Sequence, residues 1–215
     1  MQYTIKRLPA GTGAYEFSEA FDPKKLKSPW NALDEAEILD YPWLSLYPDH
    51  FFAAARVGLS DRGINVLMYA KEAPVRAKET KFGGMPCEDS CLEFFLCPFP
   101  EDGDKYFNIE INPIGTAHVG VGEGRHGRRV YDKPIEGLQI NTCVSGAFWA
   151  VSFVIPNSLF VENFGKTPTS GAEMKGNFFK CSGHELHEHY GCWNHVGTER
   201  PDYHRPEYFA PIAVE

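Results

Sequence analysis

Short runs in which apolar and polar residues alternate follow one another along most of the chain, with turn-forming residues between them. The clearest pair, residues 51–59 and 64–71, flanks Ser60-Asp61-Arg62-Gly63 and predicts a β-hairpin with a short turn. Similar β-rich runs predict strands at residues 90–97, 105–112, 116–121, 147–155, 174–181 and 208–214. The pattern therefore predicts about eight strands and no helix long enough to cover a sheet.

Consecutive hairpins of this kind are typical of two sheets packed face to face. We therefore expect an all-β fold, an antiparallel two-sheet β-sandwich of the jelly-roll or immunoglobulin-like kind, preceded by an irregular N-terminal segment. That segment, residues 1–50, is rich in Pro and aromatic residues and is expected to hold one helical turn near residues 32–39. Because no repeat or long linker divides the 215 residues, residues 1–215 are expected to form a single domain.

The expected strand 105–112 has one apolar and one polar face, because successive side chains of a strand point to opposite sides. The apolar face is expected to join the core and consists of Phe107, Ile109 and Ile111. The other face offers a ring and planar polar groups, from Tyr106, Asn108, Glu110 and Asn112. Such groups suit a sugar, whose hydroxyls need polar partners and whose C–H face rests on a ring. An ordinary solvated sheet face is the alternative interpretation, and the sequence leaves both open.

A second candidate carboxylate lies on the preceding strand, residues 90–97. If the two strands pair as a hairpin, Glu93 lies beside Asn108 or Glu110. Carboxylates that meet in this way bind a ligand or a cation, or else they repel. Asp89, at the start of the strand, is expected to cap it through backbone hydrogen bonds.

Two runs, residues 88–95 (Glu-Asp-Ser-Cys-Leu-Glu-Phe-Phe) and residues 106–112 with Gly115, resemble the central motif of the family 9-like carbohydrate-binding modules. Further matches follow in the expected order at Ala54, Arg56, residues 61–63, Trp149, residues 155–156, residues 176–181, residues 189–190, Trp193 and residues 201–207. Together they span about residues 28–214. The family is similar to the wider DOMON-type group of β-sandwiches, so the resemblance implies the same two-layer fold.

The resemblance also implies a terminal sugar held between two aromatic rings, with Glu, Arg and Asn bonded to its hydroxyls. The family's roles carry over to Glu93 as the carboxylate, Arg125 as the guanidinium, Asn177 as the amide and Trp193 as one ring. The second ring position falls at or near Cys87, so a substitute ring is needed, and the candidates are Phe82, Tyr106 and Trp30. The expected ligand-binding set is Glu93, Tyr106, Asn108, Glu110, Arg125, Asn177 and Trp193.

Structural roles compete with two of these assignments. Trp193 can simply close the end of the sandwich, because Trp is mostly buried in any fold. Asn177 and Lys180 have opposite strand parity, so both face a ligand only if a bulge intervenes. Trp149 shares the parity of Val151 and Phe153 and is expected in the core.

We expect a non-catalytic carbohydrate-binding protein linked to polysaccharide breakdown, with a separate glycoside hydrolase as its partner and no catalytic residue of its own. Two alternatives stay open. A glycoside hydrolase needs two carboxylates about 5–10 Å apart, for which Glu93 and Glu110 are candidates. A haem-binding DOMON-type domain needs Met and His ligands, and Met68, Met85 or Met174 could supply the Met.

The net charge of −8 repels phosphate backbones, so no nucleic-acid partner is expected. The sequence contains no run of about 20 apolar residues and no apolar signal core at residues 1–6, so no membrane partner is expected. The chain as written is expected in the cytoplasm, and secretion stays open if a leader was removed. The six cysteines are then expected to be reduced thiols.

The sequence defines no clear set of metal ligands. Residues 181–192 hold three His between two Cys, but their spacing matches no known zinc framework, so a polar loop is expected. Relatives of the family carry structural calcium, which Asp and Glu near strand ends could bind, although the sequence identifies no ligand set.

Overall fold

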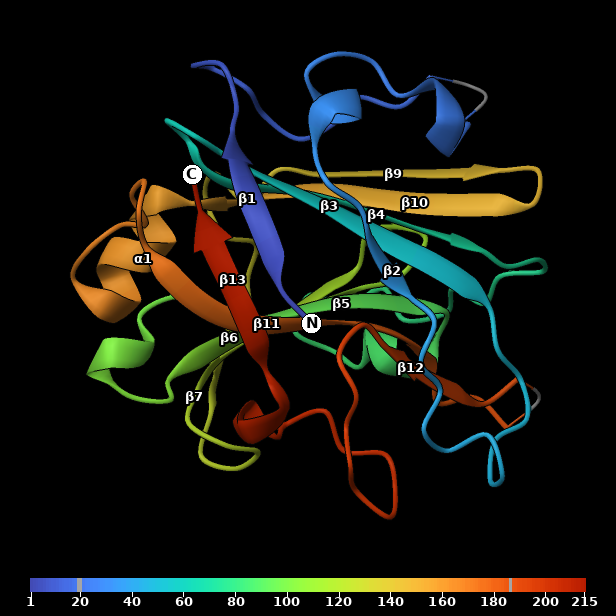
Figure 1. The fold of residues 1–215 in the computed structure, drawn as a ribbon. Helices are drawn as coiled ribbons and strands as arrows, with labels where there is room; N and C mark the ends of the chain where they lie inside the picture. Colours follow the sequence, from blue (N-terminus) through green and yellow to red (C-terminus); the bar gives the residue numbers. More distant parts are fainter. Residues whose placement is uncertain (19–20, 186) are drawn as a thin grey trace.

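A computed structural model describes residues 1–18, 21–185 and 187–215 of the chain. Its strands form two layers, here called sheet A and sheet B, which meet at β1 (Tyr3–Arg7) (Figure 1). Sheet A contains β5 (Cys91–Cys97), β6 (Tyr106–Ile111), β7 (Ala117–Gly122), β8 (Arg129–Val130), β11 (Glu173–Ser182), β12 (His189–Cys192) and β13 (Ala210–Val214). Sheet B contains β2 (Ala36–Ile38), β3 (Phe52–Ser60), β4 (Gly63–Lys71), β9 (Ile140–Ser145) and β10 (Phe148–Pro156).

The strand order explains how the two layers are joined. Sheet A runs β8-β7-β6-β5-β11-β13-β1, with β12 beside β11, and sheet B runs β1-β3-β4-β10-β9, with β2 beside β3. The predicted hairpin around residues 60–63 is confirmed as β3–β4, and the predicted pairing of residues 90–97 with 105–112 is confirmed as β5–β6. The all-β sandwich class is therefore correct.

Three expectations differ from the structure. The described residues form thirteen strands and not about eight, because local patterns in the sequence did not indicate β1, β2, β8, β9 and β12. The sheets are mixed and not purely antiparallel, because β1 pairs in parallel with both β13 and β3, strands that no hairpin connects to it. The expected helical turn near residues 32–39 is instead a 3₁₀ turn at Trp30–Ala32 followed by strand β2. Ala36 and Ile38 are buried and Glu37 is exposed, which is the two-residue period of a strand.

The main core lies between the inner faces of the two sheets. Sheet A contributes Phe94, Ile109 and Phe178, and the Phe94 and Phe178 rings stack with centroids 4.6 Å apart. Sheet B contributes Trp149 and Val66. The predicted apolar face of residues 105–112 and the predicted core position of Trp149 are confirmed. Each buried side chain of this kind contributes roughly 1.5–3 kcal/mol relative to exposure to water.

The N-terminal segment covers the outer face of sheet B (Figure 1). Tyr15 and Trp30 of this segment pack with Leu67 and Tyr69 of β4 in a second apolar cluster. A third cluster lies on the outer face of sheet A, where Phe95 and other strand residues are partly covered by the loops after β12. The one α-helix of the described residues, α1 (Asn157–Phe164), is too short to span a membrane, and no described helix is long and apolar enough to do so.

A buried set of polar side chains, here called the charge network, joins residues of sheet A to residues of sheet B. Lys180 Nζ lies 3.1 Å from Glu72 Oε2 and donates to His189 Nε2 at 2.7 Å. Glu72 also accepts hydrogen bonds from the Trp149 indole (2.7 Å) and the Ser90 hydroxyl (2.8 Å). Charges removed from water must be paired and hydrogen-bonded in this way, because an isolated buried charge is very costly.

His189 is held neutral inside this network. Its Nε2 accepts from the Lys180 ammonium while Nδ1 lies 2.5 Å from the His187 carbonyl, so a second proton has no place. Burial, and then the Lys180 charge, lower the pKa of His189 to about 2. In the unfolded chain the same group titrates near pH 6.5.

We expect His189 to make the fold acid-sensitive. Below pH 6.5 the unfolded chain binds a proton that folded His189 does not, so the folded state loses about 1.4 kcal/mol per pH unit until the pH nears the folded pKa. His189→Gln keeps an acceptor for Lys180 and should remove this pH-dependent loss of stability. Urea unfolding of both proteins between pH 7 and 4.5 measures it as the difference between them, because other titrating groups are shared. A difference that does not change with pH contradicts the assignment.

Candidate functional site

A pocket of about 270 Å³ opens on the outer face of sheet A, here called the sheet A pocket. Its floor is formed by β5, β6 and β11, and its walls by the loops at residues 123–128 and 201–205 and by β12. The lining combines carboxylates, one guanidinium, rings and thiols, from Glu88, Glu93, Glu110, Asp202, Arg125, Phe95, Tyr190, Tyr203, His204, Cys87 and Cys181. Charged and aromatic groups therefore converge on one small hollow.

Two carboxylates face each other across the floor. Glu93 of β5 is directly opposite Glu110 of β6, as the predicted hairpin pairing allowed. Burial, and then the charge of Glu110, raise the pKa of Glu93 well above its ordinary value. Glu93 Oε1 accepts a hydrogen bond from the Cys181 thiol at 2.9 Å, and Glu110 Oε1 accepts one from Asn108 at 2.8 Å. The neutral form of Glu93 is therefore favoured.

The pocket rings form a continuous series of contacts. The Tyr203 ring stacks on Phe179 with centroids 3.8 Å apart, and its hydroxyl donates to the Gly191 carbonyl at 3.0 Å. Tyr190 meets Tyr203 edge to face at 6.2 Å and, unlike Tyr203, is only half-buried. Its hydroxyl donates to Glu188 at 2.8 Å. Tyr190 therefore combines a fixed orientation with ring surface that a ligand can reach.

At the opposite wall, His204 lies against Phe95 with centroids 5.0 Å apart. Burial, and then the charges of Arg128 and Arg125, lower the pKa of His204 to about 4, so the imidazole is neutral near pH 7. Its Nδ1 lies 2.8 Å from the Tyr106 hydroxyl. The neutral ring can exchange one hydrogen bond with a hydroxyl-bearing ligand without adding charge.

Arg125 and Asp202 form an ion pair at the rim of the sheet A pocket, with 2.7 Å between Nη1 and Oδ1. Both are partly exposed, so the pair itself contributes little to stability. Asp202 Oδ1 also accepts from the His204 amide at 3.1 Å. The remaining donors of Arg125 and the second oxygen of Asp202 can therefore reach a bound molecule.

Arg128 covers the other half of the predicted polar face. Its guanidinium lies 4.0 Å above the Tyr106 ring and donates to Asn108 Oδ1 at 2.7 and 3.0 Å. It also donates to the carbonyls of Tyr106, Gly122 and Gly124. Tyr106 and Asn108 are consequently bonded within the protein, and their polar atoms do not line the pocket.

The seven expected ligand-binding residues divide into three groups. Glu93, Glu110 and Arg125 line the sheet A pocket. Tyr106 and Asn108 lie beside it, beneath Arg128. Asn177 and Trp193 lie elsewhere, and the structure does not bring them to the pocket.

The position of Trp193 follows from strand parity. Tyr190 and Cys192 of β12 point to the outer face of sheet A, so His189 and Trp193 point inward. The Trp193 ring packs edge to face on Phe178 at 5.5 Å, in the main core. This is the structural alternative that the sequence left open, and Tyr190 presents a ring to the pocket instead.

Asn177 holds the loop at Asn194 through two hydrogen bonds. Its Nδ2 donates to the Asn194 carbonyl and its Oδ1 accepts from the Asn194 amide, at 2.8 and 2.9 Å. It is fully buried and does not line the sheet A pocket. Lys180 has the opposite parity and points into the charge network, as the expected difference in parity requires.

None of the three proposed substitute rings lines the sheet A pocket. Trp30 belongs to the cluster on sheet B, Phe82 packs on the main core, and Tyr106 is covered by Arg128. Cys87 does line the pocket, as the motif alignment placed it. The sequence missed Tyr190, Tyr203 and His204 as site residues, although all three lie in runs that match the family. No comparable feature of the sequence pointed to Arg128 as a residue beside the site.

Asp89 has the capping role expected of it. Its Oδ2 accepts hydrogen bonds from the amides of Lys78 and Glu79 at 2.8 Å and from Asn112 Nδ2 at 3.0 Å, and Oδ1 lies 3.2 Å from Arg76. This carboxylate is satisfied by four protein donors, which fix the loop before β5.

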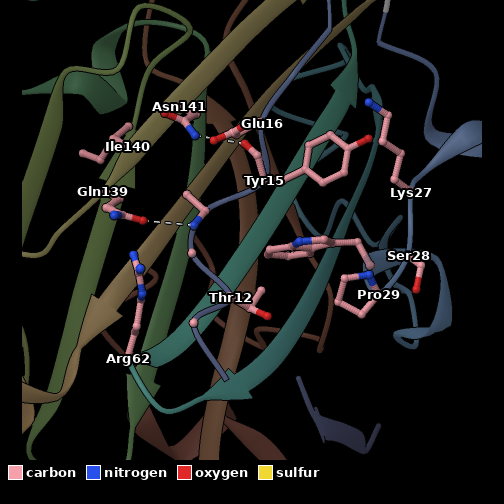
Figure 2. Close-up of a pocket in the computed structure, with 14 residues that line it drawn as sticks. Thr12, Tyr15, Glu16, Lys27, Ser28, Pro29, Arg62, Gln139, Ile140 and Asn141 are labelled. Atoms are coloured by element: carbon pink, nitrogen blue, oxygen red, sulfur yellow. Dashed lines mark hydrogen bonds between the residues drawn. The ribbon is translucent and has the colours of Figure 1, made fainter. Parts of the chain in front are cut away.

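A larger cavity of about 670 Å³ lies between the N-terminal segment, the β3–β4 turn and the start of β9 (Figure 2). Two of its polar side chains hold the protein's own chain, because Gln139 accepts from the Ala14 amide and Asn141 donates to the Tyr15 carbonyl. Of the residues expected in the site, only the substitute ring Trp30 lines it. We therefore place the candidate site in the sheet A pocket, where the carboxylates and rings meet.

Comparisons with known proteins agree with this fold and motif. Residues 20–214 match the family model for carbohydrate-binding family 9, whereas no curated protein matches the chain. A solved structure of a proposed carbohydrate-binding protein from Bacteroides uniformis is 25% identical, with a TM-score of 0.76 and 99% of each chain covered.

Two structures of a family 9 carbohydrate-binding module from Caldicellulosiruptor kristjanssonii share the fold at lower identity. The complex with cellotriose has a TM-score of 0.65 at 12% identity and covers 100% of this chain and 94% of the other. The complex with glucose has a TM-score of 0.63 at 13% identity and covers 97% and 95%. Because the family model matches nearly the whole sequence, this chain belongs to carbohydrate-binding family 9.

Proposed function

We propose that this protein binds a mono- or oligosaccharide in the sheet A pocket. One observation carries the proposal: carboxylates, a guanidinium and a half-buried tyrosine ring converge on one hollow of about 270 Å³, formed by the motif strands β5 and β6. That volume lies just below the ~300–1,000 Å³ range of most small-molecule sites, so it suits one or two sugar rings better than a long chain. The glucose and cellotriose bound by the related module support the same ligand class.

Each group has a chemical role in this proposal. The Tyr190 ring supports the apolar C–H face of the sugar. Glu110 and Asp202 accept from hydroxyls, and Arg125 donates to them. Glu93 also lines the floor, but it is almost completely buried, its raised pKa favours the neutral form, and it already accepts from Cys181, so it does not bond the sugar.

Calorimetric titration with glucose, xylose, galactose and their β-linked oligomers tests the proposal. We expect binding in the micromolar to millimolar range, or about −4 to −8 kcal/mol, because a shallow site with one ring and a few polar contacts gives no more. Tyr190→Ala is expected to weaken binding about tenfold or more, which is ~1.4 kcal/mol. The absence of binding to every sugar in the panel would refute the proposal.

Tyr208→Ala is the matched control, because Tyr208 is also a half-buried tyrosine but does not line the sheet A pocket. It should leave the sugar affinity within about twofold of wild type. Equal losses in Tyr190→Ala and Tyr208→Ala would show that the ring acts on the fold and not on the ligand.

Hydrolysis is a second candidate function, favoured by the facing Glu93–Glu110 pair and by the raised pKa of Glu93. The burial of Glu93 opposes it, because a general acid must reach the glycosidic oxygen. We therefore infer binding without turnover, with a separate glycoside hydrolase acting on the same polysaccharide. Reducing sugar that appears with wild type and disappears with Glu93→Gln would reverse this choice.

A further inference from the structure

Two buried thiols and a carboxylate meet at the floor of the sheet A pocket. Cys91 of β5 is directly opposite Cys181 of β11, and both side chains point to the outer face, as does that of Glu93. One donor atom from each of these three residues lies within 4.8 Å of the other two. All three side chains are at most 2% exposed.

This spacing is close to that of a zinc site. Zn–S bonds of about 2.3 Å and Zn–O bonds of about 2.0–2.2 Å at tetrahedral angles put the donor atoms roughly 3.5–3.8 Å apart. Cys181 Sγ and Glu93 Oε1 are 2.9 Å apart and would separate slightly, whereas the other donor atoms need to close by at most about an ångström, and side-chain rotations supply both adjustments. Two thiolates and one carboxylate are also a ligand set that zinc accepts, because zinc is a borderline-soft cation.

We propose that Cys91, Glu93 and Cys181 form a binding site for a thiophilic divalent cation of the zinc class, with the fourth coordination position open toward the sheet A pocket. Glu93 and Cys181 line that pocket, which gives the ion a path from solvent, and Cys87 lies at the same opening. The site differs from the His-rich segment 181–192, because it uses Cys181 with residues of β5 and none of the three histidines.

The protonation chemistry of the site gives an independent signature. A thiol has an ordinary pKa of about 8.5, so both thiols carry protons at neutral pH when no metal is bound. A bound cation must displace these protons, since thiolates are the ligands. Metal affinity should therefore increase with pH, and metal binding should release protons to the buffer.

Titration of the reduced protein with Co²⁺, without any sugar, tests the site. We expect one equivalent of Co²⁺ to bind, with thiolate-to-cobalt charge-transfer absorption in the near ultraviolet and the visible bands of tetrahedral cobalt, and Zn²⁺ to displace it. Cys91→Ser and Cys181→Ser should each remove most of the charge-transfer absorption. Glu93→Gln should keep it and weaken binding about tenfold or more.

Cys97→Ser is the matched control, because Cys97 is a buried thiol on the same strand and face but bonds to the Gly103 carbonyl instead. It should bind Co²⁺ as wild type does, and circular dichroism should show that every variant is folded. Either of two results would overturn the proposal: no charge-transfer absorption at millimolar Co²⁺ in wild type, or absorption that persists in both Cys91→Ser and Cys181→Ser. Because no sugar is present, this outcome is separate from that of the sugar-binding test.

Discussion

Replacing Glu72 by Gln is expected to lower the free energy of unfolding by about 3–5 kcal/mol. Gln fills nearly the same space, its carbonyl oxygen can still accept from the Trp149 indole, and its amide group can donate to the Ser90 hydroxyl oxygen, so the main change is the loss of the charge that faces Lys180. Lys180 is completely buried, and its ammonium would keep the His189 nitrogen and the Cys181 carbonyl as hydrogen-bond partners but would lose its ion-pair partner. The cost is the desolvation of an uncompensated ammonium, and urea unfolding at pH 7 measures it.

A double-mutant cycle separates this cost from a general packing effect. Lys180→Met alone leaves Glu72 uncompensated, whereas the double variant Glu72→Gln, Lys180→Met removes both charges, so its loss should be clearly smaller than the sum of the single losses. Lys166→Met is the surface control: Lys166 pairs with Glu101 and Asp102 in solvent, and its loss should be below about 1 kcal/mol. Additive single losses would mean that the pair is not coupled.

Arg128→Met is expected to cost about 2–4 kcal/mol and to weaken sugar binding about tenfold. The guanidinium supplies hydrogen bonds to Asn108 and to three carbonyls and also covers the Tyr106 ring, so its removal leaves several buried acceptors unpaired. The same loop carries Arg125, which would lose its fixed position at the rim of the pocket. Amide exchange across residues 122–128 should become faster, and calorimetry with the best sugar of the panel measures the affinity.

The neighbouring Arg129 provides the control for this experiment. It pairs with Glu162 and lies over the Tyr131 ring, both at the surface, so Arg129→Met should change stability by less than about 1 kcal/mol and leave sugar binding unchanged. Arg128→Lys keeps the charge but lacks the planar fork, and should behave more like Arg128→Met than like wild type. Wild-type affinity in Arg128→Met would mean that the loop does not shape the site.

Local patterns were enough to predict the hairpins but not the strands that join the two sheets. Residues 51–71 and 90–112 carry both alternation and turn residues, and both hairpins form as expected. β1 is five residues long and pairs with β13, which is about 200 residues away in sequence, so no local signal could identify its partner or its parallel direction. The strand β2 was missed because three alternating residues are too few to distinguish a strand from a turn.

In the candidate site, the face to which each strand residue points could be predicted, but the loop side chains that cover that face could not. The facing Glu93–Glu110 pair follows directly from alternation along two paired strands. Arg128 reaches over the sheet from a loop, which diverts Tyr106 and Asn108 from the pocket, and alternation along a strand carries no information about this contact. The ring at Trp193 was assigned by likeness to relatives, whereas the parity of β12, which only the structure fixes, presents Tyr190 instead.

The position of β1, which pairs in parallel with both β13 and β3, has a consequence for folding during synthesis. Sheet B can begin to assemble early, because β3 and β4 are joined by a tight turn, but sheet A reaches β1 only through residues 210–214. A nascent chain on the ribosome therefore exposes one edge of β1 until residues 210–214 have been translated. Such long-range closure makes folding slow, so we expect chaperones that shield open strand edges to bind this chain during synthesis.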